Sequence, residues 1–159
     1  MEKIYTFIDG QNLYKSVQGQ GWKIDYRKLY IYLQEKFHAA KIFYFIGYIE
    51  SNKQLYKKLR HFGYTIIFKP TVMQDGVIKG NVDGELILHA MIEYQNYSKA
   101  IIVSGDGDFY CLASYLQDQG KLERIIIPDK NRYSKLLRKF GKRITYLNDQ
   151  KEKLKRKET

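Results

Sequence analysis

The sequence predicts an α/β fold with a mainly parallel sheet and helices on both of its faces. Apolar runs typical of buried strands alternate along the chain with amphipathic segments typical of helices. This alternation indicates βαβ units, whose crossovers are right-handed. The chain has 159 residues, of which 44% are hydrophobic, so it is long enough and apolar enough to fold around a core of its own.

The strands are predicted from runs of β-branched and aromatic residues, and the helices from apolar residues three or four positions apart. We expect strands over residues 3–9, 40–49, 64–68, 100–103, 122–127 and 143–147, and helices over 26–37, 51–61, 82–95, 109–119 and 132–140. Asp25 and Ser51 are the expected N-caps of the first two helices, and Gly63 is expected to end the second. The segment 10–12 is predicted to be a turn.

Three segments depart from this plain alternation. Residues 71–80 alternate around Asp75-Gly76, a hairpin turn sequence, so we expect a protruding β-ribbon there. Helix 82–95 is expected to bury an apolar stripe made of Ile87, Ala90, Met91 and Tyr94. From Asn148 the chain is mostly lysine and arginine with little to bury. We therefore assign residues 1–147 to the domain and 148–159 to a basic tail, either a solvated helix or a frayed end.

The charge of the chain favours a polyanionic partner. It carries 28 Lys and Arg against 17 Asp and Glu, a net charge of +11. Nucleic acid is the preferred interpretation, an anionic membrane is another, and an ordinary basic surface is the simplest alternative. No apolar run approaches the roughly 18 residues that a bilayer span needs, and the start lacks a signal-peptide layout. Cys111 is the only cysteine, which fits a reducing cytoplasm, and we expect it to be a small core residue.

Four acids are the candidates for chemistry. Asp106 and Asp108 follow the predicted strand 100–103, and Asp9 ends the first strand. Because the carboxyl ends of parallel strands share one edge, where ligands bind, these three acids are expected to lie together. Asp83 heads helix 82–95 and points toward the protein body, but the sequence leaves open whether it reaches the same edge.

Clustered carboxylates repel one another unless a cation or a proton lies between them. Oxygen ligands of this kind suit Mg²⁺ or Mn²⁺, ions that support phosphodiester hydrolysis. The glycines at 105 and 107 are expected to leave room for an ion or a phosphate. The alternative is that each aspartate is a cap or turn residue, which for Asp9 alone is the simpler explanation. Other classes fit less well, because the chain has no phosphate-binding loop, dinucleotide fingerprint or Gly-x-Ser-x-Gly elbow.

Three motifs in this chain resemble the NYN domains, which have PIN-like nuclease folds. The motifs are Phe7-Ile8-Asp9-Gly10-Gln11-Asn12, Lys79-Gly80-Asn81-Val82-Asp83 and Val103-Ser104-Gly105-Asp106-Gly107-Asp108-Phe109. Their order and spacing cover residues 3–147. The resemblance implies a Rossmann-like three-layer α/β/α fold with an acidic, metal-binding pocket, and RNA as the substrate.

The resemblance also implies roles by position. Asp9, Asp83, Asp106 and Asp108 would be the metal-site acids. Asn12 would orient a carboxylate or the scissile phosphate, Ser104 would support the pocket by hydrogen bonding, and Lys79 would contact phosphate. One position departs from the family pattern, because many members have another acid six residues after the middle aspartate, where this chain has His89. Position 89 lies about 120° around the helix from Asp83.

The expected activity is therefore that of a metal-dependent ribonuclease using Mg²⁺ or Mn²⁺. The basic faces at 53–60 and 132–143 and the basic tail would hold the RNA backbone, and exposed tyrosines would stack on the bases of a single strand. A non-catalytic RNA-binding or regulatory module is the main alternative, and a small-molecule phosphohydrolase is a third. An exposed strand edge or the tail could form a homodimer.

Overall fold

A six-stranded sheet forms the centre of the protein. The computed structural model describes residues 2–75, 77–79 and 81–157, with the backbone alone at 73, 74 and 77–79. The strand order is β3-β2-β1-β6-β7-β8, and every pairing in this sheet is parallel. The strands are β1 (Ile4–Asp9), β2 (Ala39–Gly47), β3 (Thr65–Lys69), β6 (Lys99–Val103), β7 (Leu122–Ile127) and β8 (Ile144–Tyr146).

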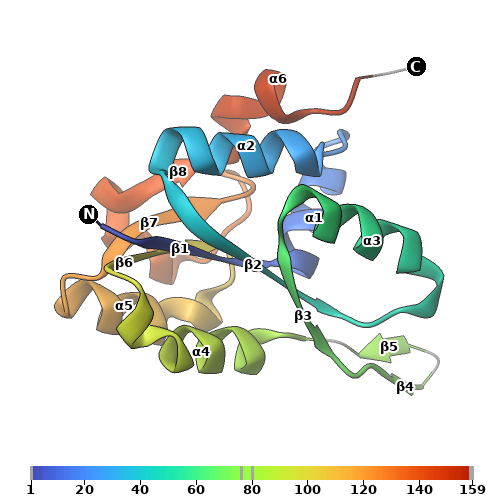
Figure 1. The fold of residues 1–159 in the computed structure, drawn as a ribbon, viewed down its shortest axis with the longest axis horizontal. Coiled ribbons are helices and arrows are strands. Elements are labelled where there is room, and N and C mark those ends of the chain that lie inside the picture. Colours follow the sequence, from blue (N-terminus) through green and yellow to red (C-terminus); the bar gives the residue numbers. More distant parts are fainter. Residues whose placement is uncertain (1, 76, 80, 158–159) are drawn as a thin grey trace.

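Helices cover both faces of the sheet, as Figure 1 shows, so the expected three-layer α/β/α fold is confirmed. One face carries α1 (Gly10–Gly19), α2 (Tyr26–Phe37), α3 (Lys53–Phe62) and α6 (Lys151–Leu154), and the other carries α4 (Asp83–Ile92) and α5 (Tyr110–Asp118). Short 3-10 helices connect them: η1 (Glu50–Asn52), η2 (Tyr94–Asn96), η3 (Gly107–Phe109), η4 (Lys135–Arg143) and η5 (Leu147–Gln150).

Two apolar cores lie on the two faces of the sheet. Along β1, Ile8 belongs to the core under α1 and α2, whereas its neighbour Phe7 belongs to the core over α4 and α5. Tyr44 and Phe45 divide between the same two cores in β2. Burying each such side chain contributes about 1.5–3 kcal/mol. A one-residue slip of a strand would move its side chains to the opposite face, so this alternation fixes the register.

The direction of winding reverses at β1. The chain passes from β1 through α1 and α2 to β2 on one side, and later returns from β3 through α4 to β6 on the other. In open α/β sheets, the crevice at such a switch point lies beyond the carboxyl ends of the two diverging strands. Asp9 is the last residue of β1, and Ser104 directly follows β6. The fold thus places these two residues at its natural binding crevice.

Several helix boundaries differ from those predicted. Residues 10–12 are not a turn but the first turn of α1, because the Asp9 side chain caps this helix at once. Ser51 is not an N-cap, since it lies inside η1, and α3 begins after Asn52. Residues 132–140 contain no α-helix, because η4 is a 3-10 helix with a kink at Phe140.

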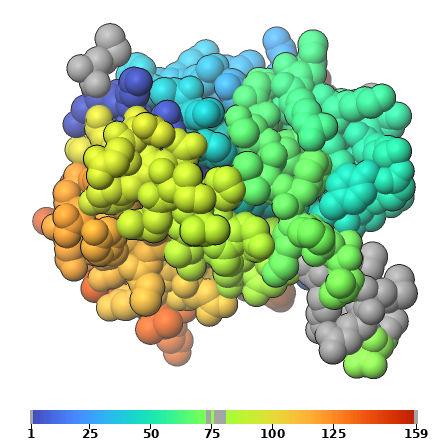
Figure 2. All heavy atoms as spheres, turned by 60° about the horizontal axis from the view of Figure 1, so that its bottom comes forward, coloured from blue at the N-terminus to red at the C-terminus, as the bar shows by residue number. Residues whose placement is uncertain are grey.

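The predicted buried stripe of α4 is confirmed in part. Ala90 is fully buried against the sheet, and Ile87 and Tyr94 are half-buried against the same core. Met91, however, is exposed, and the fully buried Leu86 was not predicted. Figure 2 shows the molecular face that α4 and α5 form. Cys111 is exposed on α5, so the expectation of a buried cysteine is wrong.

The basic C-terminal segment contains the short helix α6 with exposed charged residues, as one of the two expectations had it, but the segment packs onto the domain and is not frayed. Leu154 is fully buried in the core that includes α2. Ile24 and Lys155 form an antiparallel bridge, and the backbone N–H of Arg156 donates to the carbonyl of Lys23 at 2.9 Å. A single leucine therefore anchors a segment whose charged residues are mostly exposed. The domain boundary at residue 147 stays a prediction.

The expected ribbon forms after β3. Strands β4 (Val72–Gln74) and β5 (Val77–Lys79) pair in antiparallel fashion around Asp75, which has the positive φ of 52° that hairpin turns require. Gly76 of the predicted turn lies outside the described residues. Among the helices that the structure describes, none is long and apolar enough to cross a membrane.

Candidate metal centre

Three carboxylates converge at the carboxyl edge of the sheet. Asp9 ends β1, Asp106 caps η3 after β6, and Asp83 is the first residue of α4. One oxygen of each lies within 4.8 Å of the others. Asp9 is only 4% exposed, and the other two are half-buried. The structure therefore brings together acids from three distant segments, including Asp83, whose position the sequence left open.

Asp9 caps a helix and faces the cluster at the same time. Its Oδ1 accepts a hydrogen bond from the backbone N–H of Asn12, and its Oδ2 accepts one from the hydroxyl of Ser104, both at 3.2 Å. Burial raises the pKa of Asp9, these two hydrogen bonds oppose the rise, and the charge of Asp106 adds to it. Capping and cation binding are thus compatible roles, because the cap fixes the orientation of the carboxylate.

Ser104 and Asn12 join the ends of β1 and β6. The Ser104 hydroxyl donates to Asp9 and accepts the backbone N–H of Asp106 at 3.1 Å. The side-chain carbonyl of Asn12 accepts the N–H of Gly105 at 2.9 Å. Ser104 is only 1% exposed, so its hydroxyl contacts the Asp9 carboxylate from the protein interior. The structure thus gives both residues positions that support the acid cluster.

Asp83 is the member of the cluster whose protonation is most perturbed. Burial, a hydrogen bond with the Asp108 side chain, and the charges of Asp106 and Asp9 raise its pKa to about 7. Asp108 itself is exposed, and it lies beside Asp83 rather than among the three converging carboxylates. Near neutral pH the cluster therefore retains a proton, and a cation bound there would take the place of that proton.

Gly105 and Gly107, on either side of Asp106, leave room for a neighbouring loop. A Cβ at Gly105 would lie 3.0 Å from the Cβ of Tyr133, and one at Gly107 would lie 2.4 Å from the hydroxyl of Ser134. The N–H of Ser134 also donates to the carbonyl of Gly105 at 3.0 Å. The space beside these glycines, which was expected to admit an ion or a phosphate, is therefore filled by residues 132–134.

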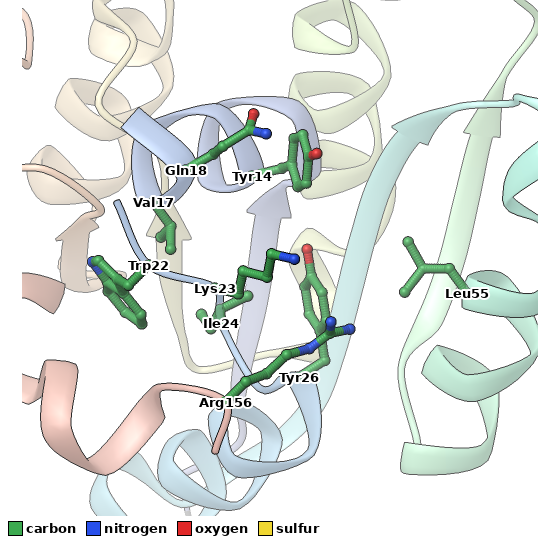
Figure 3. A pocket seen from close by; sticks show the side chains of 9 residues that line it. All are labelled: Tyr14, Val17, Gln18, Trp22, Lys23, Ile24, Tyr26, Leu55 and Arg156. Atoms are coloured by element: carbon green, nitrogen blue, oxygen red, sulfur yellow. The ribbon is translucent and has the colours of Figure 1, made fainter. Parts of the chain in front are cut away.

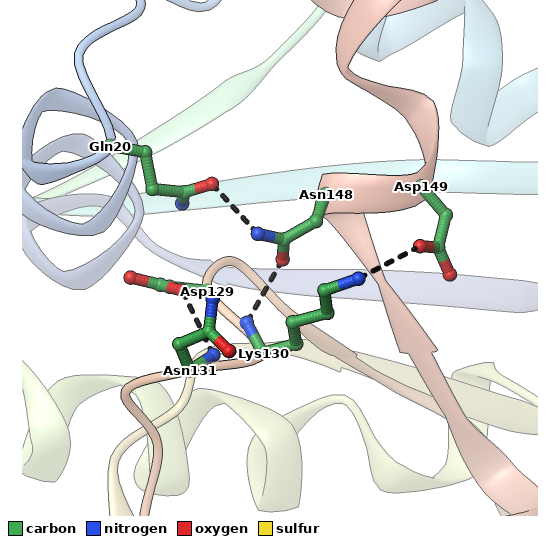
Figure 4. A network of polar contacts seen from close by, with 6 residues as sticks. All are labelled: Gln20, Asp129, Lys130, Asn131, Asn148 and Asp149. Carbon is green, nitrogen blue, oxygen red and sulfur yellow. Dashed lines mark hydrogen bonds and ion pairs between the residues drawn. The ribbon is translucent and has the colours of Figure 1, made fainter.

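A polar network holds this loop in place, as Figure 4 shows. Gln20, just after α1, donates to the carbonyl of Pro128 and accepts from the side chain of Asn148, both at 2.9 Å. Asn148 in turn accepts the N–H of Lys130 at 2.9 Å. Asp129 is 6% exposed and caps the same turn. Sequence analysis missed Asp129, although it follows β7 as Asp106 follows β6; it lies outside the three-carboxylate cluster.

The remaining predicted residues lie apart from the cluster or outside the described side chains. The ring of His89 packs 5.7 Å from that of Phe45, on the face of the sheet. The side chain of Lys79 is not among those that the structure describes. A cation that sequence analysis missed is Lys69, whose Nζ donates to the carbonyl of Asn81 at 2.6 Å and lies 3.8 Å from Glu85.

The model of the NYN domain family matches residues 3–148. The chain therefore belongs to the NYN domain family, as its three motifs predicted. No curated protein sequence matches the chain.

Solved structures with a similar fold include a protein of unknown function from Vibrio parahaemolyticus RIMD 2210633. It has a TM-score of 0.79 and 22% identity, and the match covers 98% of this chain and 96% of that one. T5 5′-exonuclease with bound zinc has a TM-score of 0.49 and 13% identity over 94% of this chain. Bacteriophage T5 D15 flap endonuclease, with DNA and metal ions, has a TM-score of 0.48 and 10% identity over 88% of this chain. Each match covers 60% of the phage protein.

Proposed function

We propose that this NYN domain is a metal-dependent ribonuclease that uses Mg²⁺ or Mn²⁺. The observation that carries the proposal is the convergence of Asp9, Asp83 and Asp106 at the switch point of the sheet. Carboxylate oxygens are the ligands that these hard cations prefer. Burial first, and the neighbouring carboxylates second, raise the pKa values of Asp9 and Asp83, and perturbed carboxyl groups of this kind are typical of functional sites.

The residues of the cluster fit a divalent cation. Hydrogen bonds already orient Asp9 and Asp106, so the binding of an ion would cost these side chains little freedom. An ion held there would supply Lewis acidity, which polarises a phosphoryl oxygen and lowers the pKa of water. Asp83 would exchange its proton at the half-buried edge of the cluster. The side-chain nitrogen of Asn12 makes no hydrogen bond within the described part of the chain and could donate to a phosphate oxygen.

The surface around the cluster favours a polyanionic substrate. The net charge is +11 despite the acids at the cluster. Exposed cations Arg132, Lys135 and Arg138 belong to the loop beside Gly105 and to η4, next to the cluster. Phosphate contacts of this kind position a nucleic acid strand without reading its sequence. Together with the family resemblance, this supports single-stranded RNA as the substrate.

The test is cleavage of an end-labelled, mixed-sequence single-stranded RNA with Mn²⁺, Mg²⁺ or EDTA. We expect metal-dependent cleavage that falls at least about 100-fold in Asp9→Asn and Asp106→Asn, because the loss of groups outside the ligands already costs roughly 10–100-fold. Asp118→Asn makes the same change at an exposed site on α5 and should cleave like the wild type.

A non-catalytic RNA-binding module is the second candidate. It is favoured by His89, which packs on Phe45 where many family members have an acid. This candidate predicts that the wild type cleaves RNA under none of these conditions and that the wild type and Asp106→Asn bind RNA equally. That pair of results would contradict the proposed ribonuclease.

A further inference from the structure

A groove crosses the α1 side of the sheet near its carboxyl edge. Two cavities, of about 300 Å³ and about 200 Å³, share Tyr14, Tyr26 and Leu55 in their walls. The larger is lined by Gln11 and the end of β2, and the smaller by Arg156 of the C-terminal segment. Figure 3 shows the smaller cavity, with Leu55 across from Tyr26. We name this surface the Tyr14–Arg156 groove.

Tyr44 connects this groove to the acid cluster. It lines the larger cavity, and its hydroxyl donates to the carbonyl of Gly10 at 3.4 Å, directly beside Asp9. The hydroxyls of Tyr44 and Tyr26 lie 3.2 Å apart. Burial raises the pKa of Tyr44 well above its ordinary value, and the charges of Tyr26 and Asp9 contribute to the rise. The backbone at Gly10, next in sequence to Asp9, therefore contacts a residue of the groove wall.

Four polar side chains of the groove have no hydrogen-bond or ion-pair partner in the described part of the chain. Gln11, Lys15, Lys23 and Arg156 make no side-chain hydrogen bond and no ion pair there. In Figure 3 the side chains of Lys23 and Arg156 reach toward the ring of Tyr26. Nearby acids already have other roles, since Asp25 caps α2 and Glu50 pairs with Lys53. The groove thus presents uncompensated positive charge.

Aromatic surface lies next to this charge. Tyr14 is 53% exposed on α1, and its hydroxyl makes no hydrogen bond within the described residues. Such a ring can stack on any nucleobase, because every base has an aromatic face. The larger cavity is at the lower end of the roughly 300–1,000 Å³ typical of small-molecule sites. Its size suits one nucleotide and excludes a duplex.

We propose that the Tyr14–Arg156 groove binds one unpaired nucleotide of the RNA strand that passes the acid cluster. The base stacks on Tyr14, and Lys15, Lys23 and Arg156 contact its phosphates. This inference rests on the proposed function for the identity of the strand. It extends that function by assigning substrate contacts to Tyr14, Lys15, Lys23 and Arg156, which lie outside the three family motifs. The assignment predicts a site that tolerates any base.

Among the described residues, the face formed by α4 and α5 (Figure 2) lacks this combination of groups. Leu88, Ile92 and Tyr115 are among the large apolar or aromatic side chains that these helices expose. The nearby Lys121 is already engaged, because its Nζ donates to the carbonyls of Tyr94 and Tyr97. Within the described residues of α4 and α5, the exposed tyrosine has no free cation beside it, so Tyr115 supplies a control.

The test measures binding in EDTA, so its outcome does not depend on cleavage. A short fluorescein-labelled single-stranded RNA of mixed sequence is titrated with the wild type, Tyr14→Ala, Tyr14→Phe and Tyr115→Ala. Tyr14→Ala should weaken binding roughly 5- to 150-fold, the range for removal of one stacking ring. Tyr14→Phe keeps the ring and should bind like the wild type, as should Tyr115→Ala, whose residue is 44% exposed on α5.

The salt dependence tests the phosphate contacts. Arg156→Gln should reduce the slope of log K against log[salt] by about 0.7, the value for one phosphate contact on a single strand. Lys36→Gln removes an exposed charge in the last turn of α2 and should leave the slope unchanged. The groove assignment is overturned if the wild type fails to bind this RNA, if Tyr14→Ala binds like the wild type, or if Tyr115→Ala weakens binding equally. Loss of binding in Tyr14→Ala alone would support it even if the protein never cleaves RNA, an outcome that separates it from the proposed ribonuclease.

Discussion

The acid cluster contains Asp9, and the Tyr14–Arg156 groove contacts the next residue, Gly10, through Tyr44. The two regions carry charges of opposite sign. In the cluster, three carboxylates converge and the pKa of Asp83 is raised to about 7. In the groove, Lys23 and Arg156 have no acidic partner among the described residues. The cluster needs a positive charge and the groove a negative one. A divalent ion and a phosphodiester strand would complete both regions together.

The two regions also differ in how they are built. The cluster is formed at the ends of buried parallel strands, where the Ser104 hydroxyl and the backbone N–H of Asn12 hold the Asp9 carboxylate by hydrogen bonds. The groove has a largely buried aromatic and apolar wall, and its charged and stacking groups are exposed side chains of α1, the 20–25 segment and the C-terminal segment. The cluster is therefore expected to respond sharply to small changes in packing, and the groove to changes in surface charge and aromatic area.

Gly10→Ala should have the largest effect, because this residue lies where the two regions meet. A Cβ there would lie 2.7 Å from the backbone oxygen of Phe45 and 2.7 Å from the ring of Tyr44. Overpacking of this kind costs about 1–3 kcal/mol, which lowers Tm by about 2–12 °C in a protein of this size. Differential scanning calorimetry measures the change.

Gly19→Ala is the matched control, because it lies in the same helix with nothing within 4 Å of the added Cβ. It should leave Tm unchanged or slightly higher, since alanine restricts the unfolded chain. An equal loss of stability in both variants would show that contact with Phe45 and Tyr44 is not the cause.

Ser104→Ala should affect metal binding at the cluster and leave RNA binding in the groove unchanged. It removes the hydrogen bond to Asp9 and leaves the N–H of Asp106 without its acceptor. Loss of a group that orients metal ligands costs roughly 10–100-fold in metal affinity, so Mn²⁺ binding measured by calorimetry should weaken by that factor. RNA binding in EDTA should not change.

Ser114→Ala, at a half-buried serine of α5 without a hydrogen bond in the described chain, is the control for this substitution. Equal Mn²⁺ affinities for the two serine variants would contradict a role for Ser104 in fixing the carboxylates.

The pH dependence should also differ between the regions. Burial and neighbouring acids raise the pKa of Asp83 to about 7, compared with about 3.9 when unfolded. The folded protein thus binds the extra proton between these values, and the contribution of Asp83 to stability falls as pH rises through that window. Mn²⁺ replaces the proton, so it should raise Tm more at pH 8 than at pH 5.5, and its affinity should fall up to about tenfold per pH unit below 7.

RNA binding in EDTA should stay nearly constant from pH 6 to pH 8, because lysine and arginine keep their charge in this range. Thermal melts with and without Mn²⁺ and RNA titrations at each pH check the contrast. A Tm increase from Mn²⁺ that is equal at both pH values would contradict the assignment of the titrating group to the cluster.

Much of the cluster could be predicted because strand ends can be read from sequence. Asp9 and Asp106 each follow an apolar run, and parallel strands place their carboxyl ends at one edge. Asp83 could not be placed in this way, since its position depends on how the chain returns from β3 through α4 to β6. The loop that packs on Gly105 and Gly107 was also beyond prediction, because no local pattern indicates the contact.

The groove could not be predicted, because none of the residues that form it carries a local sequence signal of its own. Tyr14 is one of fifteen tyrosines, and its exposure depends on how α1 packs against β2. Arg156 lies in a segment that its charge marks as solvated. One leucine, Leu154, docks that segment under α2, and a single apolar residue gives no periodic signal.

Binding of Mn²⁺ tests most directly whether the three carboxylates hold a divalent ion. The free-ion signal in electron paramagnetic resonance is followed as Mn²⁺ is added at pH 8 to the wild type, Asp106→Asn and Asp118→Asn. We predict a saturable site in the wild type and in Asp118→Asn, and affinity at least about 100-fold weaker in Asp106→Asn. Equal binding by all three proteins, or no saturable site in the wild type, would contradict the metal centre.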